Sequence, residues 1–150
     1  MIQTKTKILI RDNSAFLEAS CINYSKNSSS LTKGAKIGNC IKASISKIKS
    51  NVNKGRGSGS FVRETNAKSS LQNLLVIQTK KPIYRGDGST LQFAFNSGVS
   101  IILKKVKAKK AYQLGFKRIN STIPFELKDK TRMQKLKAVL ATVKLAKHLV

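Results

Sequence analysis

Acidic residues are scarce in this sequence. Only six residues are Asp or Glu, against thirty Lys and Arg, which leaves a formal net charge of +24 at pH 7. A compact domain with this charge repels itself unless a polyanion neutralises it. The shortage of acids therefore predicts a polyanionic partner, either nucleic acid or an anionic membrane surface.

Long apolar runs are also lacking. No stretch approaches the roughly 18 consecutive apolar residues that a membrane-spanning helix needs. The chain nevertheless has 150 residues, of which 40% are hydrophobic, so one domain with a real core is expected without disulfides. The first ten residues show no apolar region followed by a small-residue cleavage site, so we expect no removable leader.

Cysteine and histidine are too few for a metal framework. The chain has two cysteines, Cys21 and Cys40, and one histidine, His148, near its end. This set does not fit a zinc site. Each cysteine lies next to apolar residues, so we expect two small core residues with free thiols in a reducing compartment, and a disulfide is the alternative.

Residues for catalysis are missing as well. No two of the six acids have the spacing of a carboxylate dyad or a metal site, and no G-x-S-x-G, H-E-x-x-H or Walker A pattern occurs. The glycine-rich run 55–59 lacks the strand-to-helix context of a phosphate loop, so it indicates a flexible loop. We therefore expect no enzyme, no cofactor and no metal.

Short apolar alternations dominate what is present. They predict strands at 5–10, 18–24, 40–49, 74–77, 91–95 and 99–103. Ile41, Ala43 and Ile45 share one face of the third strand, with a bulge or the end of the strand expected near Ile48. Turns are expected at 11–14 and 96–98, and a long loop at 53–73 that orders on its partner. This pattern favours a mainly β fold, a small antiparallel barrel.

The last part of the chain changes period. Apolar residues from Met133 to Val143 have helical spacing, and Thr131 and Gln134 fit a capping box. The opposite face is rich in lysine. We expect a basic amphipathic helix over 129–150 that docks on its own domain and presents lysines to RNA, with a membrane surface as the alternative.

The run T-K-K-P-I-Y-R-G-D-G-S, residues 79–89, predicts a hairpin. Asp87 and Gly88 are typical of a tight turn between two strands, because glycine adopts positive φ at little cost. The hairpin would then present Lys80, Lys81 and Arg85 to phosphate. A solvated, charged turn is the alternative.

Several short motifs occur together in register. They are M-I-Q at 1–3, D-N-S at 12–14, C-I at 21–22, T-K-K at 79–81, R-x-D-G-S at 85–89, Phe93, Asn96 and Val99. Over residues 1–103 this set resembles the universal large-subunit ribosomal protein numbered fourteen, in its bacterial and organellar form. The likeness continues more weakly at 115–119 and 124–128.

The resemblance implies a five-stranded β-barrel with a C-terminal helical part and no catalytic activity. It implies a structural role in binding large-subunit rRNA at the subunit interface, contact with small-subunit rRNA in an intersubunit bridge, and neighbouring ribosomal proteins as partners. The family also docks a ribosome silencing factor. No membrane partner and no homo-oligomer are expected.

The chain departs from the family in three places. Residues 57–72 look like an insertion, 23–33 lacks a glycine pair, and the tail from Lys130 is longer. We therefore expect a β-barrel domain over 1–128 and a C-terminal helix over 129–150. The extra length and charge favour a mitochondrial ribosome, with a plastid or a bacterial cytoplasm as alternatives.

Position and charge select the residues expected to bind rRNA, with Tyr84 added as a stacking face. They are Lys42, Lys47, Lys49, Lys54, Arg56, Lys80, Lys81, Tyr84, Arg85, Lys104, Lys105, Lys107, Lys109, Lys110, Lys117 and Arg118. The alternative function is a free-standing single-strand binder or a membrane-surface protein. A single-strand binder usually offers several aromatic rings, whereas this chain has 6% aromatics and no tryptophan.

Overall fold

Eight strands form the sheets of the described chain, and residues 126–127 make a short helical turn. The computed structural model describes residues 1–24, 34–49, 69–106, 109–114, 118–127, 144 and 148–150, with the backbone alone at 102–106 and 109–114. The strands are β1 (Lys7–Ile10), β2 (Phe16–Tyr24), β3 (Cys40–Ile48), β4 (Leu71–Gln78), β5 (Ile83–Tyr84), β6 (Thr90–Leu91), β7 (Ser97–Val106) and β8 (Lys109–Leu114).

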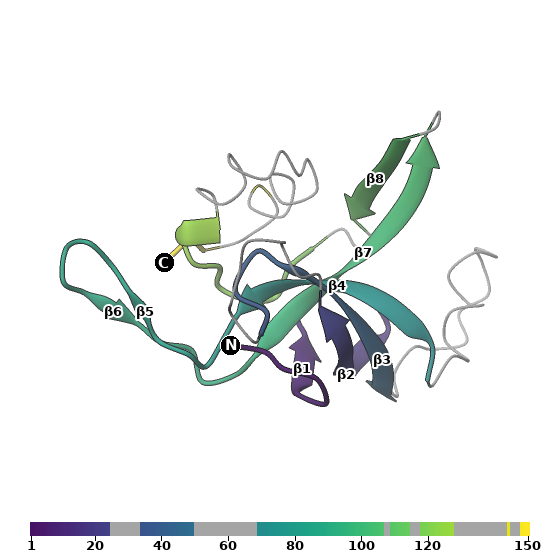
Figure 1. Ribbon diagram of the computed structural model, residues 1–150, viewed down its shortest axis with the longest axis horizontal. Helices are drawn as coiled ribbons and strands as arrows, with labels where there is room; N and C mark the ends of the chain where they lie inside the picture. The colour runs from purple at the N-terminus through teal and green to yellow at the C-terminus, as the bar shows by residue number, and fades with distance from the viewer. Residues whose placement is uncertain (25–33, 50–68, 107–108, 115–117, 128–143, 145–147) are drawn as a thin grey trace.

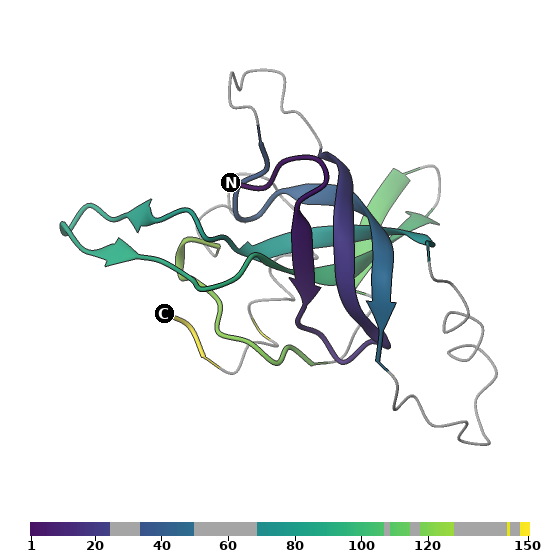
Figure 2. The ribbon, with the colours of Figure 1, turned by 90° about the horizontal axis from the view of Figure 1, so that it is seen from below.

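Five of these strands close into a barrel, as the sequence predicts. The sheet runs β1-β2-β3-β4-β7-β8, and an additional pairing of β1 with β7 closes it. All neighbouring pairs are antiparallel except β1 and β7, which run parallel with Leu9 opposite Ser97. Figures 1 and 2 show the barrel from two sides, with the β7–β8 ribbon extending beyond it.

Alternation along the strands fills the barrel. Ile8 and Ile10 of β1 are buried, and so are Ile41, Ala43 and Ile45 of β3, whereas Lys7 and Lys42 are exposed. Successive side chains on a strand point to opposite faces, so this pattern puts one face inside. The predicted inward faces of these two strands are confirmed. The expected irregularity near Ile48 also occurs, as register shifts between Phe16 and Glu18 of β2.

Strand β4 is buried on both faces. The four consecutive residues Leu74–Ile77 have no exposed surface. One face of β4 points into the barrel, and the segment 118–127 covers the other. The Gln78 side chain donates from Nε2 to the Thr122 carbonyl oxygen over 2.8 Å. Ile119, Ile123 and Leu127 are fully buried in the same core. Covering an outer face lets this continuous apolar run exist in a small barrel.

A second, two-stranded sheet projects from the barrel. Strands β5 and β6 form a hairpin between β4 and β7, and Figure 1 shows this arm reaching away from the barrel on the left. We call residues 79–96 the hairpin arm. It lacks the long strand expected at 91–95, because β6 ends at Leu91. Ser97 and Gly98 belong to β7, so the tight turn expected at 96–98 is also absent.

The long loop expected at 53–73 ends earlier than predicted, because β4 begins at Leu71. Leu71, Gln72 and Asn73 are the first residues of β4, where they pair with Ser44, Ala43 and Lys42. Backbone pairing to β3 thus overrides the polar composition of this stretch. Residues 53–68 of that loop, and with them most of the expected insertion at 57–72, lie outside the described residues.

The C-terminal helix expected over 129–150 lies mostly outside the described residues. Its last three residues do not extend it: Leu149 forms a parallel bridge with Ile123, and the Phe125 amide donates to the Val150 carbonyl oxygen over 2.8 Å. The end of the chain is therefore extended and paired. Within the described ranges, no helix is long and apolar enough to cross a membrane.

Both cysteines carry free thiols, as expected. Cys21 is 2% exposed in the core, and Cys40 is half-buried against it. Burial raises the pKa of the Cys40 thiol to about 11 and also raises that of Cys21. Neither environment resembles that of a reactive thiolate.

Candidate nucleic-acid interface

Three of the residues predicted to bind rRNA are exposed on the hairpin arm. Lys80 and Lys81 are exposed, and Tyr84 is 77% exposed. Ile83 pairs with Leu91 and Tyr84 with Thr90, which confirms the predicted hairpin. These side chains are therefore displayed from a hydrogen-bonded ribbon.

The tip of the arm is shaped as the Asp-Gly pair predicts. Gly88 has a φ of 83°, a region in which other residues are strained. The Asp87 Oδ1 accepts the Ser89 amide over 2.8 Å, and the Arg85 amide donates to the Ser89 carbonyl oxygen over 3.0 Å. Asp87 is thus a turn former. Its hydrogen bonds from the Ser89 side chain and backbone lower its pKa.

Arg85 points back to the protein. Its guanidinium forms an ion pair with Glu126 and donates from Nη2 to the Val150 carbonyl oxygen over 2.9 Å. The hydrogen bond to Glu126 raises the pKa of Arg85. This residue therefore ties the arm to the paired segments 123–125 and 148–150, which leaves less of its charge available to an external phosphate.

Two hollows flank the arm. A shallow one lies between the tip and Phe125, lined by Tyr84, Arg85, Gly86, Asp87, Phe125 and Glu126. A cavity of about 230 Å³ lies at the base of the arm, lined by Met1, Lys36, Ile37, Thr79, Lys81, Pro82, Ile83 and Glu126. Its lining is mainly apolar, with lysines at its rim. Within the described ranges, no three His, Cys, Asp or Glu residues gather to hold a metal.

The three predicted lysines of β3 and its end differ in their surroundings. Lys42 is exposed, and Lys47 pairs with Glu18 over 3.1 Å while its side chain stays 63% exposed. Lys49 Nζ instead donates to the carbonyl oxygens of Asp12 and Ser14 over 3.1 and 2.8 Å. Lys49 therefore supports the turn after β1.

Asp12 is the centre of that turn. It is 1% exposed, and its Oδ1 accepts the Ser14 amide over 2.8 Å. Its Oδ2 accepts the Ser100 amide over 2.8 Å and the Ser100 hydroxyl over 2.7 Å. One buried carboxylate thus joins the turn to β7 next to the seam where β1 and β7 close the barrel.

The second predicted cationic patch lies on the β7–β8 ribbon. Lys104 pairs with Ala111 and Lys105 with Lys110, and Lys109 begins β8. Arg118, past the ribbon, is exposed. The hairpin arm and this ribbon leave the barrel in different directions (Figure 1), so they form two separate basic regions. Lys54, Arg56, Lys107 and Lys117 lie outside the described residues.

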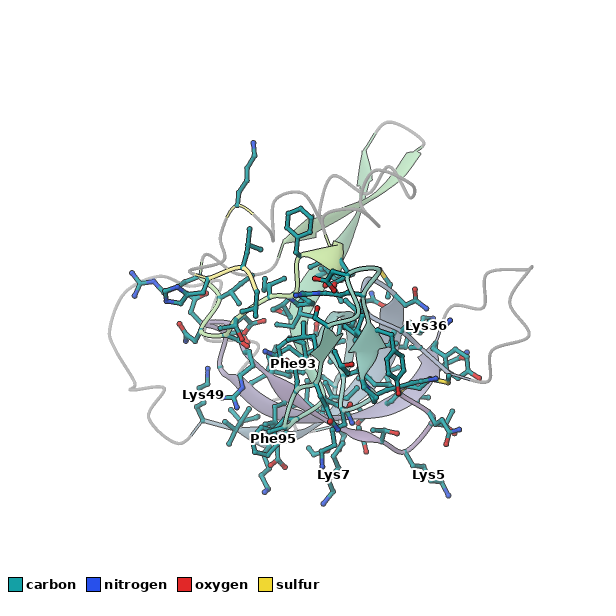
Figure 3. The ribbon with its side chains drawn as sticks, turned by 90° about the vertical axis from the view of Figure 1, so that its left-hand side faces the viewer. Lys5, Lys7, Lys36, Lys49, Phe93 and Phe95 are labelled. Atoms are coloured by element: carbon teal, nitrogen blue, oxygen red, sulfur yellow. The ribbon has the colours of Figure 1, made fainter. Side chains whose placement is uncertain are left out.

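Sequence reasoning missed three exposed lysines near the N-terminus. Lys5, Lys7 and Lys36 are exposed, and Figure 3 shows Lys5 and Lys7 along the lower edge of the barrel. The alternation of the first strand, with Ile8 and Ile10 on one face, is the signal that could have identified an outward Lys7. What the sequence did not reveal is which part of the hairpin arm lies beside it.

The described part of the chain is a small closed β-barrel from which two basic ribbons project. The family model for ribosomal protein L14p/L23e matches residues 1–143. The chain belongs to this family of ribosomal proteins, which confirms the resemblance.

A curated relative agrees with this assignment. The chain is 28% identical over 130 residues to "Large ribosomal subunit protein uL14c" of Helicosporidium sp. subsp. Simulium jonesii, an alignment that covers 86% of this chain and 88% of the relative. The likeness therefore spans most of both proteins, including the barrel and the hairpin arm.

Proposed function

We propose that this protein is a structural constituent of the large ribosomal subunit that binds rRNA through the cations of its arm, its β7–β8 ribbon and the outer face of β3. Family membership carries this proposal. The relative named as a large-subunit protein supports the choice of subunit.

The charge distribution supports rRNA as the ligand. Within the described ranges, the ion pairs are Lys47 with Glu18 and Arg85 with Glu126, so most of the thirty Lys and Arg have no acid to neutralise them. Lysine and arginine release counterions when they bind phosphates, which supplies affinity without reading bases. Folded RNA is recognised mainly through its shape and backbone.

The structure refines the predicted contact residues. Lys42, Lys80, Lys81 and Arg118 are exposed and suited to phosphate contact, and Lys47 keeps most of its surface. Lys49 and Arg85 are proposed to position the binding elements, because their charged groups bind acceptors within the protein. Tyr84, next to Arg85 in the sequence, offers an exposed aromatic ring.

The proposal also includes three more specific partners. They are small-subunit rRNA at an intersubunit bridge, neighbouring ribosomal proteins, and a ribosome silencing factor. The location proposed is an organellar ribosome, in the mitochondrion first, with a plastid or a bacterial cytoplasm as alternatives. Sedimentation of separately purified organelles, followed by detection of the protein in their subunits, tests that location.

Charge reversal on the arm tests the rRNA contact. Lys80→Glu with Lys81→Glu places two negative charges on exposed positions that phosphates are proposed to occupy, so incorporation into large subunits is expected to fall several-fold. Gradient sedimentation of extracts at moderate salt measures it. The matched control, Lys80→Arg with Lys81→Arg, keeps the charge and should sediment as the wild type does.

The same gradients separate the alternatives. Co-migration of the wild-type protein with large subunits, resistant to moderate salt, supports the proposal. Migration with membranes or as a free monomer contradicts it. Normal incorporation of the double-glutamate variant would remove Lys80 and Lys81 from the contact.

A further inference from the structure

The start of β1 lies beside the end of the hairpin arm. β1 and β7 pair in parallel, with Leu9 opposite Ser97, and the Leu9 amide donates to the Asn96 carbonyl oxygen over 3.0 Å. Lys7 precedes the paired residue Leu9 by two positions, and Phe95 precedes Ser97 by two positions, so both belong to the segments that lead into this end of the seam. Figure 3 shows both side chains at the lower edge of the barrel.

Phe95 is exposed although its backbone is held in place. The side chain is 52% exposed, and the barrel core is complete without it. The next residue, Asn96, accepts hydrogen bonds at its carbonyl oxygen from Leu9 and at Oδ1 from the Lys80 amide over 2.9 Å. The Gln92 side chain also donates from Nε2 to the Lys80 carbonyl oxygen over 3.2 Å. The ring is therefore presented to solvent from an anchored position.

Exposed lysines occur in the segments that hold Phe95 in place, since Lys7 begins β1 and the Lys80 backbone binds the side chain of Asn96. Lys5, Lys7 and Lys80 are exposed, and none of them forms an ion pair with a described carboxylate. The acid on the same outer face of the sheet is Glu18, opposite Leu9, and its carboxylate binds Lys47. An anion approaching Phe95 thus meets lysines without a competing acid that the structure describes.

We propose that Phe95, with Lys7 and Lys80, forms a subsite for an unpaired RNA nucleotide. The base stacks on the ring, and the two lysines contact the phosphates on either side of it. This inference rests on the proposed rRNA binding and adds a contact to a base. Every base has a face that can stack on an aromatic ring, and unpaired bases are the ones available for it.

A tryptophan at position 95 reports stacking directly. The chain contains no tryptophan, so Phe95→Trp creates a single tryptophan in the full-length protein, whose emission can be excited apart from that of the tyrosines. Single-stranded oligouridylate should quench its emission saturably, whereas a tryptophan placed by Leu71→Trp should respond little. Leu71 is a matched control because it is 67% exposed at the start of β4. Equal quenching at both positions would overturn the subsite.

Binding measurements separate stacking from charge. Phe95→Ala is expected to weaken binding of single-stranded oligouridylate about ten-fold, as loss of one stacked base does. Binding of an RNA duplex should change little, and Phe95→Tyr should restore the affinity. Fluorescence anisotropy measures all three, and circular dichroism confirms that the variants fold.

The other possible outcomes contradict either the subsite or the proposed function. Unchanged single-strand affinity in Phe95→Ala, or an equal loss for the duplex, contradicts the subsite while leaving rRNA binding by the lysines intact. A loss seen with anionic phospholipid vesicles and not with RNA assigns the edge to a membrane and also contradicts it. Failure of the wild-type protein to bind either RNA would overturn the proposed function itself.

Discussion

The barrel and the hairpin arm use the same local motif for different ends. Asp12-Asn13-Ser14 and Asp87-Gly88-Ser89 each contain an aspartate whose Oδ1 accepts the amide of the serine two residues on, over 2.8 Å in both turns. Asp12 is 1% exposed, whereas the turn around Asp87 is exposed. The local hydrogen bond is therefore the same, and the surroundings differ.

The second oxygen of each carboxylate shows what the surroundings add. The Asp12 Oδ2 accepts both the amide and the hydroxyl of Ser100, 88 residues away in the sequence. No corresponding bond from another strand reaches Asp87 among the described residues. The turn at Asp12 thus stabilises the closed barrel, whereas the turn at Asp87 shapes the tip of an arm that reaches out of it.

Removing a core side chain should have the largest effect. Leu74 is fully buried in β4, and Leu74→Ala leaves a cavity, so we expect the free energy of unfolding to fall by about 4 kcal/mol. Leu71→Ala changes the same residue type three positions earlier, at a side chain that is 67% exposed, and should change stability little. Urea unfolding of the full chain measures both. Similar losses would show that the start of β4 is buried in solution.

Asp12→Ala should have the next largest effect. It leaves the Ser100 amide and hydroxyl and the Ser14 amide without their buried acceptor, and we expect a loss of about 3 kcal/mol. Asp87→Ala is the matched control and should leave the unfolding midpoint nearly unchanged, because its turn lies outside the barrel. The same urea titration checks the pair. Equal destabilisation by both would contradict the contrast between the two turns.

Acid pH should destabilise the turn at the tip of the arm, with a smaller effect than that of Leu74→Ala or Asp12→Ala. The hydrogen bonds from Ser89 lower the pKa of Asp87 below its usual 3.8. A lowered pKa means that ionised Asp87 stabilises the turn above pH 3.8, and that this contribution is lost as the pH falls through the lower value in the folded state. The NMR shift of the Ser89 amide, followed from neutral to acid pH, reports the titration.

Ser89→Ala sharpens that measurement. It removes the hydrogen bond from the serine hydroxyl, the largest cause of the shift, so the Asp87 titration should move up toward 3.8. An unchanged titration in Ser89→Ala would show that another group holds the pKa down.

Much of the barrel could be predicted because its signals are local. The alternation of Ile41, Ala43 and Ile45 follows directly from the two-residue period of a strand. The Asp-Gly turn depends on the positive φ that Gly88 adopts. The strand expected at 91–95 was wrong for the opposite reason: its alternation is genuine, but no neighbouring strand pairs with it beyond Leu91.

The candidate site was less predictable, because the availability of a cation depends on distant residues. Arg85 and Lys80 are both cations in the run 79–89, and the sequence does not distinguish their roles. In the structure Arg85 pairs with Glu126, which lies 41 residues later. Lys49 is held by carbonyl groups 35 and 37 residues earlier. The segments that carry Lys7 and Phe95 are far apart in the sequence and are brought together where β1 pairs with β7.

Composition and local pattern thus determined the basic surface, the strand faces, the shape of the turn at Asp87 and the family. These depend on the backbone and on neighbours within a few residues, which the order of amino acids specifies directly. Tertiary contacts decided which cations are held within the protein, and the closure of β1 onto β7 brought the segment of Phe95 next to β1. Such contacts join residues far apart in the chain, and only the folded barrel brings them within reach of one another.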